Sequence, residues 1–67
     1  SHGTDVKRLQ QKLIEKGYLA AGEDDGKFGP KTYLAVVQFQ LANGLTPDGV
    51  VGTKTFNALF GDDGAVG

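Results

Sequence analysis

Three segments of the chain place apolar residues with the spacing of an α-helix. In the first, apolar residues at i, i+3, i+7 and i+8 form one helical face, made of Val6, Leu9, Leu13 and Ile14. Thr4 or Asp5 can cap the first turn, and Gly17 is typical of a position just past a helix end. We therefore predict a helix of about a dozen residues that begins at Thr4 or Asp5.

The second segment is the most apolar part of the chain. Gly29-Pro30 begins it, because proline is favoured at the first helical position, and Asn43-Gly44 ends it, with Leu45 folding back over the end. Apolar side chains cover most of its circumference, from Tyr33 to Leu41. A helix that is apolar nearly all round is buried, so we predict that this helix is the central one.

The third segment completes a small all-α fold. A short helix begins at Gly52-Thr53 and is expected to turn Phe56, Leu59 and Phe60 inward. We predict a three-helix bundle over residues 4–60. Residues 1–3 are interpreted as a cloning remnant, and residues 61–67, which lack periodicity, as a flexible tail or the start of a linker.

Two glutamines interrupt the apolar faces of the first two helices. Gln10 projects between Val6 and Ile14, and Gln40 lies within the apolar arc of the second helix. A buried amide without a hydrogen-bond partner costs about 1–3 kcal/mol. We therefore predict that each glutamine satisfies the backbone of a neighbouring loop.

The pattern Asp-Gly-x-x-Gly-x-Lys-Thr-aromatic occurs twice, at residues 25–33 and 48–56. Each copy predicts a turn–helix unit, so the bundle is expected to contain two pseudo-repeated units. Gly26 and Gly49 would supply the positive φ of the turn, and Asp25 and Asp48 would close the turn through their carboxylates.

Composition limits the function. The chain has 67 residues, no cysteine and a net charge of −1. No apolar run approaches the length of a membrane span, and no basic excess favours nucleic acid. A helix-turn-helix DNA-binding domain would also have three helices. Its recognition helix would be basic, however, and Lys54 is the only basic residue of the third helix predicted here. The basic residues Arg8, Lys12 and Lys16 on the first helix are interpreted as a solvated face, with a basic ridge for an anionic polymer as the alternative.

No catalytic or metal-binding constellation is visible. The only serine and histidine, Ser1 and His2, lie in the doubtful N-terminal segment, which excludes a nucleophilic triad from the core. The acidic run of Glu23, Asp24 and Asp25 lacks the alternating ligands of a calcium loop and is interpreted as a solvated turn. We therefore predict a binding or structural module that is not an enzyme, with no cofactor and no metal.

The ordered motifs resemble one family, the peptidoglycan-binding domain of the three-helix type. The resemblance runs from about Val6 to Leu59 and rests on these segments: Leu9-Gln10-x-x-Leu13, Gly17-Tyr18, Asp25-Gly26-x-Phe28-Gly29-Pro30-x-Thr32, Ala35-Val36-x-x-Phe39-Gln40, Asn43-Gly44-Leu45 and Asp48-Gly49-x-Val51-Gly52-x-x-Thr55. Thr53 departs from it, because the family more often repeats the proline seen at Pro30.

The resemblance implies a small all-α module that is appended to bacterial or phage cell-wall hydrolases, amidases or peptidases. A similar module also occurs in secreted metalloproteinase precursors, so the fold does not fix the ligand.

The resemblance leads to a specific hypothesis. The chain would be a non-catalytic, monomeric module, secreted or in the cell envelope, that binds the glycan strand or stem peptide of peptidoglycan and holds a covalently linked hydrolase there. The alternative is a protein-interaction or autoinhibitory pro-domain that covers a neighbouring catalytic domain. Membrane and nucleic acid are not expected partners.

The candidate ligand-binding residues lie in the two repeated units and are Asp25, Gly26, Lys27, Tyr33, Asp48 and Gly49. Lys27 is the strongest candidate, because a turn lysine has little structural role and can pair with a carboxylate. Tyr33 is expected either to stack on a sugar or to pack in the core, as Phe56 would. Phe28 and Val51 are expected to anchor the two loops in the core.

Overall fold

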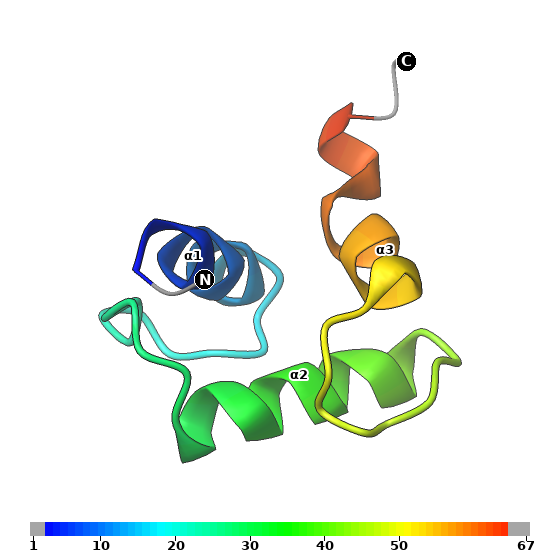
Figure 1. Cartoon of the computed structure of the whole chain (residues 1–67), viewed down its shortest axis with the longest axis horizontal. Coiled ribbons are helices and arrows are strands. Elements are labelled where there is room, and N and C mark those ends of the chain that lie inside the picture. The colour runs from blue at the N-terminus through cyan, green and yellow to red at the C-terminus, as the bar shows by residue number, and fades with distance from the viewer. Residues whose placement is uncertain (1–2, 65–67) are drawn as a thin grey trace.

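The computed structural model describes residues 3–64 and contains three helices and no strand within them. The helices are α1 (Thr4–Glu15), α2 (Pro30–Ala42) and α3 (Thr53–Gly64). In Figure 1, α1 is seen nearly end-on, α2 runs across the view below it, and α3 stands upright beside it. The predicted all-α, three-helix fold is confirmed.

Two helices end in the same way. Gly17 and Gly44 have φ values of 90° and 70°, and each is followed by an apolar residue that folds back onto the helix. The Tyr18 N–H donates to the carbonyl of Leu13 at 2.8 Å, and the Leu45 N–H donates to the carbonyl of Gln40 at 2.8 Å. These six-to-one hydrogen bonds define the Schellman cap, so the predicted ends of both helices are confirmed.

Helix α1 begins at Thr4 and has 12 residues, as predicted, but the predicted side-chain cap is wrong. Gly3, with a φ of 67°, precedes the helix, and neither Thr4 nor Asp5 caps it, because no side chain bonds the first-turn N–H groups. The Gly3 carbonyl accepts a hydrogen bond from the Lys7 N–H at 2.8 Å, which draws Thr4 and Asp5 into the helix itself. The Gly3 N–H donates to the carbonyl of Gly26 at 3.3 Å. Gly3 therefore ties the start of α1 to the loop that precedes α2.

Helix α3 is longer than the sequence predicts. It continues past Phe60 to Gly64, so residues 61–64 of the expected tail are helical. Gly61 and Gly64 are poor helix formers, which is why periodicity and propensity place the end earlier. Residues 65–67, like residues 1 and 2, lie outside the described part of the chain.

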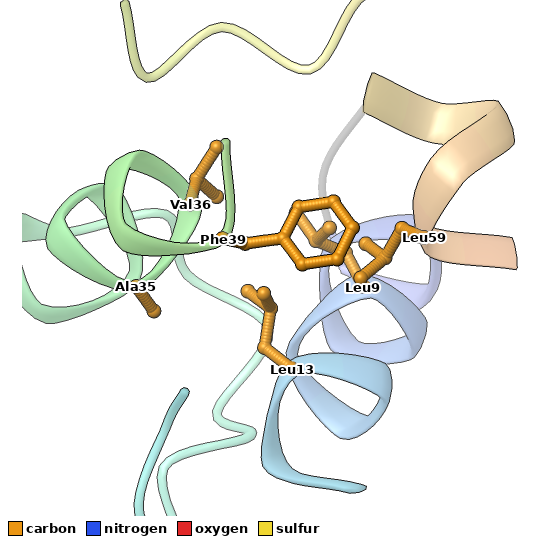
Figure 2. Close-up of a cluster of buried hydrophobic side chains, with 6 residues drawn as sticks. All are labelled: Leu9, Leu13, Ala35, Val36, Phe39 and Leu59. Carbon is orange, nitrogen blue, oxygen red and sulfur yellow. The ribbon is translucent and has the colours of Figure 1, made fainter. Parts of the chain in front are cut away.

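The core lies where the three helices meet. Its buried side chains come from all three helices and are Leu9, Leu13, Ala35, Val36, Phe39 and Leu59. Figure 2 shows the Phe39 ring of α2 extending to the side chains of α1 and to Leu59 of α3. Tyr18 meets Phe39 edge to face, with ring centroids 5.5 Å apart. Aromatic pairs favour this geometry, so the capping residue of α1 also closes one side of the core.

The prediction that α2 is buried on nearly every side is wrong. Leu34 and Leu41 are each 58% exposed, on a face that no other described element covers. Helix α1 packs against both α2 and α3, so α1 is the shared helix of the bundle. A chain this short has too few elements to surround any one helix.

The interpretation of Arg8, Lys12 and Lys16 as a solvated face of α1 is wrong for the middle residue, Lys12. Lys12 is only 5% exposed, and its Nζ atom lies 3.4 Å from the Glu15 carboxylate. Arg8 is exposed and Lys16 is half-buried. The three residues therefore do not form one continuous basic ridge.

Candidate ligand-binding loops and groove

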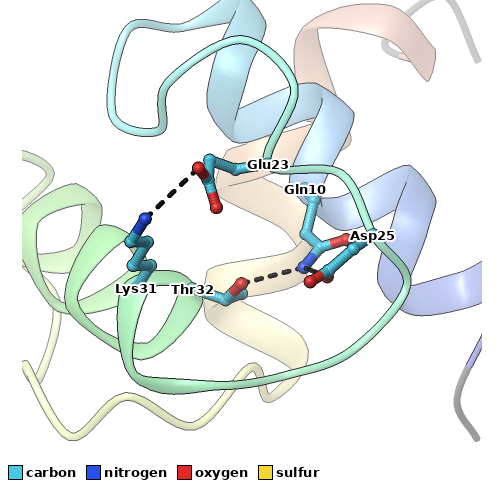
Figure 3. A network of polar contacts seen from close by, with 5 residues as sticks. All are labelled: Gln10, Glu23, Asp25, Lys31 and Thr32. Carbon is cyan, nitrogen blue, oxygen red and sulfur yellow. Dashed lines mark hydrogen bonds and ion pairs between the residues drawn. The ribbon is translucent and has the colours of Figure 1, made fainter.

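The amide of Gln10 organises the loop that precedes α2. Gln10 is fully buried on α1, and its Oε1 atom accepts a hydrogen bond from the Gly26 N–H at 2.8 Å. Its Nε2 atom donates to three oxygens of the same unit, which are Asp25 Oδ1 at 3.0 Å, the Lys27 carbonyl at 2.9 Å and Thr32 Oγ1 at 2.9 Å. Figure 3 shows this amide between Asp25 and Thr32. The predicted role of Gln10, to satisfy a neighbouring loop backbone, is confirmed.

The amide of Gln40 organises the loop that precedes α3 in the same way. Gln40 is 1% exposed on α2, and its Oε1 atom accepts from the Gly49 N–H at 2.9 Å. Its Nε2 atom donates to the matching oxygens of the second unit, which are Asp48 Oδ1 at 3.1 Å, the Val50 carbonyl at 3.0 Å and Thr55 Oγ1 at 3.0 Å. The predicted role of Gln40 is confirmed as well.

The two aspartates close their turns and are held as carboxylates. Asp25 Oδ1 accepts from the Lys27 N–H, and Asp48 Oδ1 accepts from the Val50 N–H, both at 2.9 Å. The Lys27 N–H, and after it the Gln10 amide, lowers the pKa of Asp25 below its ordinary value. The Val50 N–H is the main cause of the lowered pKa of Asp48. Loss of solvent around this carboxylate acts in the opposite direction and raises its pKa.

In the first loop, three candidate residues are brought together around Gln10. Asp25 and Lys27 are exposed, whereas Gly26 is half-buried and its N–H is already donated to Gln10. Lys27 forms no ion pair with another described residue, although Lys31 lies 3.3 Å from the Glu23 carboxylate. The surface here forms a shallow cup of about 340 Å³, lined by Glu23, Asp25, Lys27, Gly29, Pro30, Lys31 and Thr32.

In the second loop, the other three candidate residues are brought together. The ring of Tyr33 lies directly on Gly49, so closely that a Cβ atom at Gly49 would overlap the ring. Gly49 is buried, its φ is 75°, and its N–H is donated to Gln40. Tyr33 is 45% exposed, so it is not a core residue, and it covers the loop that contains Asp48.

The surface beside this second loop is more polar than the first cup. It encloses about 360 Å³ and is lined by Gln40, Gly44, Leu45, Thr46, Asp48, Val50, Gly52, Thr53, Lys54 and Thr55. Thr46 and Thr53 are exposed in this recess and offer hydroxyl donors and acceptors, whereas the Thr55 hydroxyl is buried and accepts from Gln40. The candidate residues therefore form two separate groups, one on each loop.

A third recess is absent from the sequence-based predictions. It is a groove of about 460 Å³ between α1 and α3, lined by Asp5, Val6, Arg8, Leu9, Phe28, Val51, Phe56 and Phe60. We refer to it as the α1–α3 groove. Phe28 and Phe56, expected to point inward, are 43% and 51% exposed, whereas Val51 packs against the core as predicted. Helical periodicity cannot reveal a recess that joins residues from three distant segments.

The described residues offer no evident site for a metal. Within residues 3–64, no three His, Cys, Asp or Glu side chains are grouped closely enough to hold one. The acidic run at Glu23, Asp24 and Asp25 is engaged in other contacts, because Asp24 accepts a hydrogen bond from Gln11 at 3.2 Å. None of α1, α2 and α3 is long and apolar enough to cross a membrane.

Comparison with known proteins gives a consistent set of relatives. Zinc D-Ala-D-Ala carboxypeptidase of Streptomyces albus G is 43% identical over 63 residues, which are 90% of this chain and 24% of that protein. The N-acetylmuramoyl-L-alanine amidase CwlM of Mycobacterium tuberculosis is 37% identical, over 88% of this chain and 14% of its own length. The spore cortex-lytic enzyme of Bacillus cereus is 45% identical, over 85% of this chain and 22% of its own length. The chain thus spans about a quarter or less of these three relatives.

No solved structure matches the chain. The family described as "Putative peptidoglycan binding domain" matches residues 2–59. That range includes α1, α2, both glutamine-held loops and more than half of α3. The chain therefore belongs to the peptidoglycan binding domain family.

Proposed function

We propose that this chain is a non-catalytic, monomeric module that binds peptidoglycan and holds a linked cell-wall hydrolase on its substrate. The observation that carries the proposal is the family match over residues 2–59. The named relatives support it, because each is a hydrolase in which the matched region is a minor part of the length. A secreted or cell-envelope location follows from the substrate.

We place part of the contact with peptidoglycan on the two loops. The N–H groups of Gly26 and Gly49 are used within the fold, so these glycines serve the site by shaping the loops. The exposed groups of the two loops include the Lys27 side chain and the carboxylates of Asp25 and Asp48. Lys27 can pair with a carboxylate of a stem peptide, and the exposed edge of Tyr33 can contact a sugar.

The test is retention on insoluble, purified peptidoglycan. The full 67-residue chain should pellet with the polymer at moderate salt, and Lys27→Ala should reduce the bound fraction severalfold. Lys7→Ala is the matched control, because it removes the same charge from an exposed position on α1 outside all three recesses. A wild-type chain that stays in the supernatant, while a known binder pellets, contradicts the proposal.

The exposed face of α2 supports a second candidate function. Leu34 and Leu41 lie two turns apart, and both remain more than half exposed. An apolar face of this kind fits packing against a neighbouring catalytic domain, as an autoinhibitory pro-domain would require. A longer protein should then be less active with this segment than without it, and Leu34→Ser with Leu41→Ser should restore the activity. Equal activity with and without the segment excludes this alternative.

A further inference from the structure

The α1–α3 groove lies over the edge of the core and carries two exposed aromatic side chains, Phe28 and Phe56. Phe56 and Phe60 lie with ring centroids 4.6 Å apart and form one wall. Phe28 lies on the groove as well, at the end of the first loop. Phe28 and Phe56 keep 43% and 51% of their surface exposed. Burying this aromatic surface under a ligand would be favourable, at roughly 25 cal/mol for each Å² removed from water.

Two opposite charges lie at the same groove. Asp5 and Arg8 are three residues apart on α1, a spacing that places both side chains on one side of the helix. Both are exposed, and neither forms an ion pair with another described residue. The guanidinium of Arg8 can bind a carboxylate through two parallel hydrogen bonds, and Asp5 can accept from an amine.

The lining of the groove discriminates between the two parts of peptidoglycan. Apart from Asp5 and Arg8, every lining side chain is a valine, a leucine or a phenylalanine. A glycan strand carries many hydroxyl groups, and each one buried there without a partner would cost about 1–3 kcal/mol. A stem peptide instead presents alanine methyl groups together with free carboxylates and an amine. Its chemistry therefore matches both the apolar walls and the two charges.

We propose that the α1–α3 groove binds the stem peptide of peptidoglycan. Arg8 binds a carboxylate of the peptide, Phe28 and Phe56 cover its methyl groups, and Asp5 faces its amine. This inference rests on the proposed function and assigns the peptide portion of the same ligand to the groove between α1 and α3, which Phe28 and Val51 of the two loops help to line. The hydroxyl-lined recess beside Asp48 is better suited to sugar.

The experiment is a chemical-shift titration of the full chain with the free tetrapeptide L-alanyl-γ-D-glutamyl-meso-diaminopimelyl-D-alanine. A peptide-free oligosaccharide of β-1,4-linked N-acetylglucosamine is titrated in parallel. We expect the peptide to shift the amide signals of Arg8, Phe28 and Phe56, and the oligosaccharide to leave them unchanged. Arg8→Ala should raise the Kd for the peptide about tenfold.

Controls separate lost binding from lost folding. Lys7→Ala removes a neighbouring positive charge that does not line the groove and should leave the Kd unchanged. Phe28→Ala gives a second, uncharged variant at a half-exposed position, and it should also weaken peptide binding. Each variant is used only if its amide spectrum retains the dispersion of the wild-type chain.

The outcomes also distinguish this inference from the proposed function. If the chain pellets with whole peptidoglycan while the tetrapeptide shifts no groove signal, the stem-peptide inference is overturned and the proposed function stands. Groove shifts caused by the oligosaccharide, or equal Kd values for Arg8→Ala and wild type, overturn it too. A chain that does not pellet overturns the proposed function itself.

Discussion

The two Asp-Gly loops share a set of hydrogen bonds but differ in what surrounds them. Gly26 lies beside the backbone of Gly3, whereas Gly49 lies beneath the ring of Tyr33. The first loop exposes Lys27 where the second has Val50. The shared bonds build the turn and start the following helix. The surroundings decide what each loop presents to solvent, so equivalent loops need not have equivalent functions.

The largest expected effect comes from removing either glutamine. Gln10→Ala and Gln40→Ala each leave a loop glycine N–H without its acceptor and open a cavity where the buried side chain was, so each should lower the free energy of unfolding by about 3 kcal/mol. Urea unfolding measures both, with the exposed Gln11→Ala as the control. If one variant loses much more than the other, the two networks are not energetically equivalent.

The second-largest effect is a difference in unfolding free energy between alanine variants of Gly26 and Gly49. Gly26→Ala should cost about 1–2 kcal/mol, because alanine disfavours positive φ while its Cβ atom would meet only ordinary contacts. Gly49→Ala should cost about 1 kcal/mol more, because its Cβ atom also displaces Tyr33. Thermal unfolding in the Tyr33→Ala background sharpens the test, since the excess cost of Gly49→Ala should disappear there. A persistent excess would place the strain elsewhere.

Acid should weaken both loops. The pKa values of Asp25 and Asp48 are lowered from 3.8 in the folded state, so each carboxylate contributes stability in full above about pH 5. That contribution is lost as the pH falls through the folded-state pKa. Asp25→Asn and Asp48→Asn keep an acceptor oxygen but do not titrate, so both should flatten the loss of unfolding free energy between about pH 5 and pH 2.

The two aspartate variants should act in the same direction. Both pKa values are lowered mainly by a hydrogen bond from the loop backbone, with the glutamine amide adding to the effect. The exposed Asp5→Asn, which lies in neither loop, is the control for loss of one negative charge. An unchanged acid dependence in the double variant would show that these carboxylates do not control acid unfolding.

The smallest effect is expected at the second glycine of each loop. Gly29 has extended backbone with a φ of −117°, and a Cβ atom would meet nothing at Gly29 or at Gly52. Gly29→Ala and Gly52→Ala should therefore change the free energy of unfolding by less than about 0.5 kcal/mol. A larger loss at only one position, measured by urea unfolding, would reveal a further difference between the loops.

The sequence predicts the local features well, because they depend on nearby residues. The helix ends at Gly17 and Gly44 and the buried roles of Gln10 and Gln40 follow from periodicity and from the need to satisfy polar groups. These requirements hold wherever the helices lie in space.

What the sequence does not predict depends on how distant segments meet. Phe28, Phe56 and Leu34 look like core residues, and only the arrangement of three helices leaves them exposed. Lys12 looks solvated, yet it is buried. The α1–α3 groove has the same origin, since its lining comes from α1, two loops and α3.

The sequence separation within the two glutamine networks has a kinetic consequence. Gln40 reaches Asp48 over 8 residues, whereas Gln10 reaches Asp25 over 15 residues. Closing the shorter loop costs less chain entropy, by roughly 0.5 kcal/mol. We expect the α2–α3 half to form early in folding and α1 to dock later. In stopped-flow measurements, Gln40→Ala should then mainly slow folding, whereas Gln10→Ala should mainly speed unfolding. The reverse pattern would place the nucleus at α1.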